Sequence, residues 1–198
     1  FRKIRAAVGD RIDIMCELHG LFSPPTAARI AQALEPFHPY WIEDPIRADN
    51  LSGYATVRRA TSSMITASET VGGRRDWARL IGTGDISIVM PDLGWCGGLT
   101  EARRIAAVAD AAGLPVAPPD CPGPPPLAAS VQFALSPPNA LIQEFVRAFY
   151  TGWYNEIAEN LPEVSNGVVS APDGAGLGTR LKPGTFERAD ANVRSSGL

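Results

Sequence analysis

The sequence has little of several features on which common functional classes depend. No apolar run approaches the roughly 20 residues of a membrane-spanning helix. The formal net charge is −3 and the pI is near 5.4, which argues against a nucleic-acid or anionic-membrane surface. The three cysteines are odd in number and widely spaced, which fits neither a disulfide framework nor a zinc site with paired ligands. We therefore expect a cytoplasmic protein that binds neither nucleic acid nor membrane.

The start of the chain lacks both a methionine and a signal-peptide pattern. It begins with Phe1 instead of methionine, and no signal-peptide pattern follows. We therefore expect a fragment of a longer protein.

What the sequence does contain is a repeat of short apolar runs and longer amphipathic ones. The expected strands are 12–16, 40–42, 64–67, 86–90, 114–117 and 140–143, and the expected helices are 24–34, 51–60, 75–81, 99–112 and 127–135. Such a repeat implies parallel strands with right-handed crossovers, either in an open doubly wound sheet or in part of a (β/α)₈ barrel. No G-x-G-x-x-G follows the first strand, so the dinucleotide-binding version has no support. After Glu144 the pattern gives way to a Gly/Pro-rich tail.

Acidic residues stand at the ends of the expected strands. Glu17, Glu43 and Glu69 each end an apolar run, at intervals of 26 residues. Because the C-terminal ends of parallel strands share one face, the three carboxylates would converge there and repel one another unless a cation compensates. All-oxygen ligation favours Mg²⁺, with Mn²⁺ as the alternative, over zinc. A single acid after a strand is more often a helix cap or turn residue, and Glu43 before Asp44-Pro45 also fits that interpretation.

Five segments resemble, in order and spacing, the mandelate racemase-like branch of the enolase superfamily. They are 17–20 (ELHG), 41–45 (WIEDP), 67–69 (ASE), 90–102 (with MPD and GGLTEA) and 141–144 (LIQE). The resemblance covers roughly residues 8 to 185 and implies an α/β fold, a TIM-type (β/α)₇β barrel. Only the third to eighth strands of that partial barrel would be present, without the capping domain and the first two strands. Residues 1–185 would form the barrel domain and 186–198 a C-terminal tail.

The resemblance implies site residues and an activity. The metal ligands of the family correspond to Glu17, Glu43 and Glu69. In galactonate dehydratase-like members, a histidine two residues beyond the first ligand is the general acid, and His19 holds that position. Asp92 matches the acid that orients the general base, and Glu144 matches a substrate-contacting acid. His38 lies in the loop that enters an expected strand, on the opposite barrel face, and is expected to be structural.

The sequence departs from the family at the general base. The branch has a histidine in an Ala-Pro-His segment, whereas residues 117–121 read Ala-Pro-Pro-Asp-Cys. Pro119 therefore stands at the base position without a proton-accepting side chain. Neither Asp120 nor Cys121 can be assumed to replace it. The two lysines lie away from the expected strand ends, which removes the lysine-based route of the muconate-cycloisomerase branch.

Three functional hypotheses follow. The leading one is a Mg²⁺-dependent dehydratase (a lyase) of a sugar acid, impaired as written and homo-oligomeric in its full-length form. Its reaction would remove the α-proton, stabilise an enediolate and eliminate the β-hydroxyl. The alternative is a non-catalytic barrel fragment or metal-binding pseudoenzyme. An unrelated metal-dependent hydrolase fits less well, because such enzymes usually show several histidine ligands and this chain has only two histidines.

Overall fold

A computed structural model describes residues 1–120 and 123–196. At its centre, four strands pair in parallel and in chain order: β1 (Cys16–Glu17), β2 (Trp41–Glu43), β3 (Met64–Ala67) and β4 (Ile88–Val89). Single parallel bridges, from Val89 to Val116 and from Val116 to Ala140, extend the sheet. The α/β class with parallel strands is therefore confirmed. The assignment of these strands as the third to eighth of a barrel stays a prediction.

The last two expected strands are shorter than the sequence predicts. Only one residue of each segment forms bridges, Val116 with Val89 and Ala140, and Ala140 with Val116. The backbone bonds from Val116 N to Asn139 O (2.9 Å) and from Leu141 N to Val116 O (2.8 Å) keep the two segments in register. Proline explains the interruption, because Pro115 and Pro118 have no N–H to donate to a ladder.

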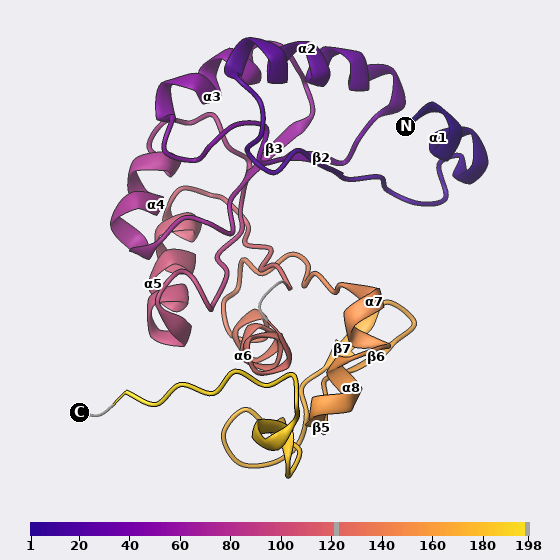
Figure 1. Cartoon of the computed structure of the whole chain (residues 1–198). Helices are drawn as coiled ribbons and strands as arrows, with labels where there is room; N and C mark the ends of the chain where they lie inside the picture. The colour runs from indigo at the N-terminus through magenta and orange to yellow at the C-terminus, as the bar shows by residue number, and fades with distance from the viewer. Residues whose placement is uncertain (121–122, 197–198) are drawn as a thin grey trace.

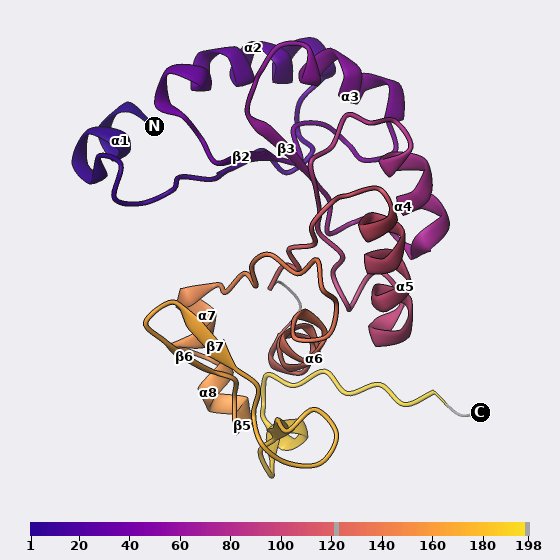
Figure 2. The ribbon, with the colours of Figure 1, turned by 180° about the vertical axis from the view of Figure 1, so that it is seen from behind.

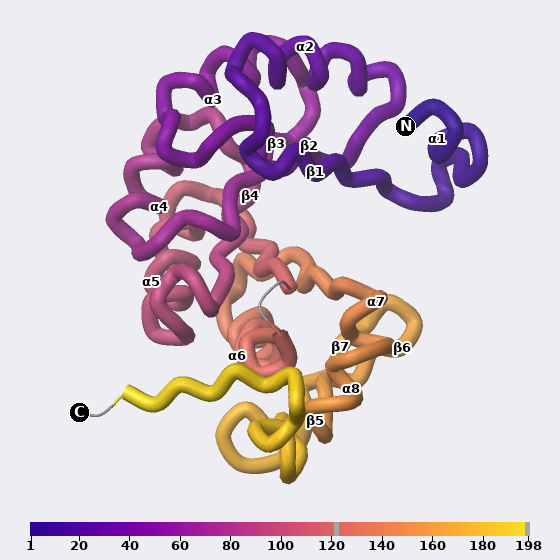
Figure 3. The backbone as a smooth tube through the Cα atoms, in the orientation of Figure 1, coloured from indigo at the N-terminus to yellow at the C-terminus, as the bar shows by residue number. Residues whose placement is uncertain are grey.

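Five helices follow one another along an arc, with the strands on its inner side (Figures 1, 2 and 3). They are α2 (Pro24–Leu34), α3 (Leu51–Arg58), α4 (Gly73–Ile81), α5 (Gly98–Ala111) and α6 (Pro124–Ala134). The Asn50 side chain caps α3 by accepting a hydrogen bond from Gly53 N at 3.2 Å. Ser23 occupies the expected cap position of α2, but its hydroxyl donates to Thr26 Oγ1 (3.0 Å) instead of capping a backbone N–H.

The two faces of the sheet pack differently. One face joins the large core beneath the helices through Cys16, Ile42, Ile65, Val89 and Val116. The other face carries a small separate cluster of Trp41, Ile88, Met90 and Ala117. Side chains alternate along a strand, so Glu17 and Glu43, which directly follow Cys16 and Ile42, turn away from the helices. The alternation thus directs both acids to the inner side of the arc.

The chain begins with a helix that the sequence analysis does not anticipate, α1 (Arg2–Val8). Arg5 fixes it by donating to the carbonyl oxygens of Phe37 (2.9 Å) and His38 (3.0 Å), at the end of the 3₁₀ turn η1 (Glu35–Phe37). His38 is therefore held through its backbone.

The segment after Glu144 is more structured than the tail that the sequence predicts. Its elements are α7 (Arg147–Tyr150), α8 (Tyr154–Ile157), β5 (Ala158–Glu159) paired with β8 (Arg180–Leu181), the hairpin of β6 (Glu163–Ser165) and β7 (Val168–Ser170), and η2 (Thr185–Glu187). Tyr154 anchors the segment on α6 by packing with Leu127 and Val131. The 3₁₀ turn η2 crosses the expected boundary at residue 185, and the division into 1–185 and 186–198 stays a prediction. No helix in the described part of the chain is long and apolar enough to cross a membrane.

Candidate active site

Five predicted site residues line one cavity of about 310 Å³ at the C-terminal ends of the strands. Its walls are Met15, Glu17, His19, Trp41, Glu43, Glu69, Met90, Ala117, Ile142 and Glu144. The parallel register sets Glu17 beside Glu43, and Glu69 follows the end of β3 by two residues. Asp92 and Pro119 are not among the lining residues.

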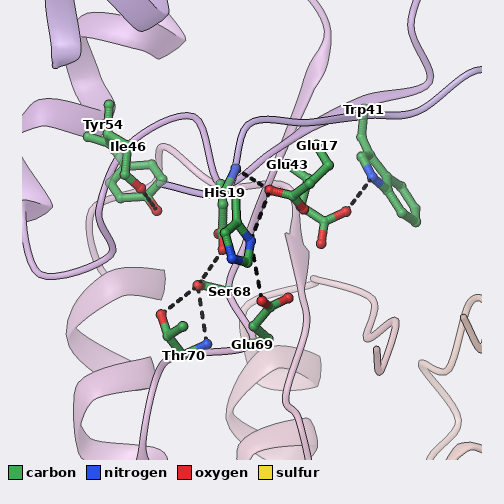
Figure 4. Close-up of polar contacts among 10 residues, drawn as sticks. Glu17, His19, Trp41, Glu43, Ile46, Tyr54, Ser68, Glu69 and Thr70 are labelled. Atoms are coloured by element: carbon green, nitrogen blue, oxygen red, sulfur yellow. Dashed lines mark hydrogen bonds and ion pairs between the residues drawn. The ribbon is translucent and has the colours of Figure 1, made fainter. Parts of the chain in front are cut away.

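Three of these side chains form a close group of possible metal donors (Figure 4). One donor atom from each of Glu17, His19 and Glu69 lies within 4.8 Å of the other two. Nδ1 of His19 is 3.7 Å from Glu17 Oε1 and 3.5 Å from Glu69 Oε1. The backbone N–H of His19 also donates to Glu17 Oε1. Burial, and then the charge of Glu17, raise the pKa of Glu69.

Glu43 lies in the same cavity but outside this close group. Its Oε2 accepts a hydrogen bond from the indole of Trp41 at 3.0 Å, and its side chain is buried. Burial, followed by the charge of Glu17, raises the pKa of Glu43 to about 9. Glu17 and Glu69 therefore belong to the close group, whereas Glu43 is bonded to the Trp41 indole and still lies near enough to Glu17 for the charge of Glu17 to raise its pKa. The ligand role of all three stays a prediction.

Asp92 caps the loop that follows β4. It is buried, and its Oδ1 accepts hydrogen bonds from Gly94 N (2.6 Å) and Trp95 N (3.1 Å). Burial raises the pKa of Asp92, while the two backbone bonds act in the opposite direction. The carboxylate thus shapes its own loop, and its role beside a general base stays a prediction.

The loop at the expected base position is closed by a structural carboxylate. Pro119 is buried, and the fully buried Asp120 accepts from Tyr154 Oη (3.0 Å) through Oδ1 and from Val146 N (3.0 Å) through Oδ2. Burial raises the pKa of Asp120, and these two bonds lower it. Asp120 is thus committed to holding the C-terminal segment. Cys121 lies outside the described residues.

Glu144 lines the same cavity as the metal-donor group. Its Oε2 accepts from Asp120 N at 3.1 Å, and its own N–H donates to Pro118 O at 3.1 Å. Burial raises the pKa of Glu144, and the bond from Asp120 N lowers it. Glu144 is held in place by the same loop that carries Pro119.

These features agree with an independent comparison of the sequence. A family model described as "Enolase C-terminal domain-like" matches residues 1–185. The chain belongs to the enolase C-terminal domain-like family. The domain of this family is a TIM-type barrel, and the resemblance to the enolase superfamily is confirmed.

Relatives of this enolase-family chain include sugar-acid dehydratases and mandelate racemase-subgroup enolases. It is 33% identical to D-xylonate dehydratase of Haloferax volcanii over 178 residues, 90% of this chain and 43% of the relative. It is 36% identical to D-galactonate dehydratase of Ralstonia pickettii over 183 residues, 92% and 47% of the two chains. The crystal structure of a mandelate racemase-subgroup enolase from Agrobacterium tumefaciens matches with a TM-score of 0.89 and 48% identity, covering 94% of this chain and 51% of that one. The chain spans about half the length of these relatives.

One functional candidate in this enolase-family chain escapes the sequence analysis. Asp44 is interpreted there only as part of a turn, yet it is 4% exposed and lines a second cavity of about 570 Å³. Its Oδ2 accepts from Ser68 Oγ at 2.7 Å, and its buried Oδ1 has no hydrogen-bond partner among the described residues. Burial raises the pKa of Asp44 to about 7, and the bond from Ser68 lowers it. The sequence signal was an acid directly after the strand-end Glu43.

Proposed function

We propose that this chain carries the metal-binding part of a sugar-acid dehydratase active site, with Mg²⁺ as cofactor and a small acid sugar as substrate. One observation carries the proposal. Donor atoms of Glu17, His19 and Glu69 lie within 4.8 Å of one another, in a cavity that Glu43 and Glu144 also line. The dehydratase activity of the relatives supports this choice of reaction.

The donor set suits a hard divalent cation. Glu17, Glu43 and Glu69 offer carboxylate oxygens, which Mg²⁺ and Mn²⁺ prefer. The raised pKa values of Glu43 and Glu69 report burial together with repulsion from Glu17, and a cation held by these side chains would offset both. Such a cation, when bound, supplies positive charge that stabilises the developing anion of the substrate.

The residues of the chain would act on protons and position. His19, with a 62% exposed side chain at the cavity wall, would donate a proton to the departing β-hydroxyl, which leaves as water. Glu144 would accept hydrogen bonds from substrate hydroxyls in the same cavity. Transfer of the α-proton to a solvent base, since Pro119 supplies no acceptor, and departure of the β-hydroxyl as water would leave an enol, which becomes a 2-keto-3-deoxy acid.

A second candidate function is a metal-binding protein without turnover. The observation that favours it is the buried Pro119 at the base position, next to Asp120, whose two carboxylate oxygens are both engaged. Neither residue offers a free proton acceptor, and a protein without a general base would turn over little substrate. The two candidate functions therefore share the metal site and differ in turnover. Cytoplasmic location and homo-oligomerisation in a full-length form stay predictions of the sequence.

Calorimetric titration with Mg²⁺ and a product assay would test the two candidates together. The assay would measure 2-keto-3-deoxy acid formed from D-xylonate, D-gluconate and D-galactonate, with Glu69→Gln as the control. Mg²⁺ binding with Mg²⁺-dependent product supports the dehydratase, and binding without product supports the non-catalytic alternative. Mg²⁺ binding that is absent, or that Glu69→Gln leaves unchanged, would contradict both.

A further inference from the structure

The imidazole of His19 stands between two cavities. One is the acid-lined cavity, and the other lies among the loops after β1, β2 and β3 and is lined by Asp44. Of the described residues, His19 alone lines both. Its side chain is 62% exposed, so rotation about its own bonds can carry the ring from one cavity to the other.

On the acid side, His19 uses oxygens that the proposed cation also needs. Its Nδ1 lies 3.5 Å from Glu69 Oε1 and 3.7 Å from Glu17 Oε1. A hard cation selects oxygen ligands over an imidazole and repels an N–H group aimed at the same oxygens. A cation bound by Glu17 and Glu69 would therefore leave the His19 imidazole without these two hydrogen-bond partners.

In the second cavity, Asp44 has a carboxylate oxygen to which no described residue donates a hydrogen bond. Its Oδ2 is held by Ser68, whereas its buried Oδ1 has no hydrogen-bond partner among the described residues. A buried carboxylate oxygen without a donor is costly, and an N–H group from a neighbour removes that cost. The backbone keeps such a neighbour close, because Gly20 N donates to Asp44 O at 2.7 Å and so ties the loop that carries His19 to Asp44.

We propose that Asp44 is the positioning residue for His19. When Glu17 and Glu69 hold a divalent cation, the imidazole turns toward the second cavity and donates one ring N–H to Oδ1 of Asp44. The bond fixes the tautomer and leaves the second ring nitrogen for the proton that His19 delivers. This inference rests on the proposed function, since it needs a cation at Glu17 and Glu69.

Nuclear magnetic resonance of ¹⁵N-histidine-labelled chain tests the ring directly, with His38 as an internal reference in the same spectrum. In the wild type, saturating Mg²⁺ should convert His19 to a single tautomer with one hydrogen-bonded N–H and leave His38 unchanged. In Asp44→Asn, the amide oxygen can stay with the Ser68 hydroxyl, which puts the amide nitrogen where Oδ1 was. His19 should then remain a mixture of tautomers. The matched control, Ser68→Ala, keeps Oδ1 and should respond as the wild type does.

A double-mutant cycle on Mg²⁺ affinity, measured by calorimetry, supplies the second readout. Asp44→Asn should weaken binding about fivefold more in the presence of His19 than in a His19→Ala background, as expected for one lost hydrogen bond. Equal losses in the two backgrounds, or an unchanged His19 response in Asp44→Asn, would overturn the role of Asp44. A direct His19–metal bond in the spectrum would overturn it too. Wild-type Mg²⁺ affinity that Glu17→Gln does not change would instead overturn the proposed function and this inference with it.

Discussion

Acidic residues follow the C-terminal ends of the strands in two groups, and the two groups have different hydrogen-bond partners. The first group, which we call the β1–β3 edge, is Glu17, Glu43 and Glu69. The second, which we call the β4–144 edge, is Asp92, Asp120 and Glu144. Each acid of the β4–144 edge accepts at least one backbone N–H. On the β1–β3 edge, within the described chain, only Glu17 does so.

The difference separates two uses of a buried carboxylate. On the β4–144 edge, backbone donors satisfy the charge and fasten loops together, so these acids stabilise the fold. On the β1–β3 edge, burial and then the charge of Glu17 raise the pKa values of Glu43 and Glu69. Among the described residues, the Trp41 indole donates to Glu43, and the His19 ring lies beside Glu69. The proposed cation would add positive charge to the β1–β3 edge, whereas backbone N–H groups already bind the acids of the β4–144 edge.

The largest effect should come from breaking the β4–144 edge. Asp120→Ala removes the acceptor for the Tyr154 hydroxyl and the Val146 N–H, two buried bonds to one carboxylate. We expect a loss of about 3 kcal/mol in the free energy of unfolding, measured by urea denaturation. Tyr154→Phe, which removes one of the two bonds, should lose about 1 kcal/mol. If Asp120→Ala has the same urea midpoint as the wild type, Asp120 does not have the structural role assigned to it.

The matching change on the β1–β3 edge should spare the fold and affect the metal. Glu69→Gln keeps the shape of the side chain and removes one charge from the group around Glu17. We expect Mg²⁺ affinity to fall at least about tenfold by calorimetry, with the urea midpoint unchanged or raised. Glu144→Gln is the control in the same cavity and should weaken Mg²⁺ binding less. A larger loss of Mg²⁺ affinity in Glu144→Gln than in Glu69→Gln would contradict a cation site at Glu69.

The pH dependence of stability should sharpen the comparison further. The pKa of Glu43 is about 9 in the folded chain and about 4.3 in an unfolded one. The folded state therefore holds more protons between these values, and its stability falls as the pH rises toward 9. Glu43→Gln mimics the protonated form and retains an acceptor for the Trp41 indole. The free energy of unfolding of this variant should exceed that of the wild type at pH 9 and match it near pH 4, measured by urea denaturation. If the free energy of unfolding falls equally in the wild type and in Glu43→Gln as the pH rises to 9, Glu43 is not the source of the pH dependence.

The sequence predicts one edge better than the other for a physical reason. The acid that ends each apolar run and the 3.6-residue period of α2 are local signals. They place Glu17 and Glu43 at strand ends and α2 at residues 24–34 without knowledge of the partners. Asp120 depends on Tyr154, which lies 34 residues away in an α8 of four residues. Elements of two to four residues carry no periodicity, so the segment after Glu144 resembles an unstructured tail until its tertiary contacts are known.

The smallest effect should come from restoring a histidine at the expected base position. A general base contributes about 10²–10⁴-fold to turnover, but only when its ring is aimed and its tautomer is fixed. Position 119 is buried, and neighbouring Pro118 O already accepts from Glu144 N and from Gln143 Nε2 (3.2 Å). Oδ1 of Asp92 is likewise engaged by its own loop, so a new imidazole would find that oxygen occupied.

We therefore expect Pro119→His to change the initial rate of 2-keto-3-deoxy acid formation by less than about tenfold, well below the value of a positioned base. Pro118→His is the matched control, since it adds the same ring one position away. A gain of about 100-fold or more, specific to position 119, would show that the β4–144 edge still holds a catalytic geometry. In that case the two edges would differ only by one side chain, and the structural assignment of Asp92 would have to be replaced by a catalytic one.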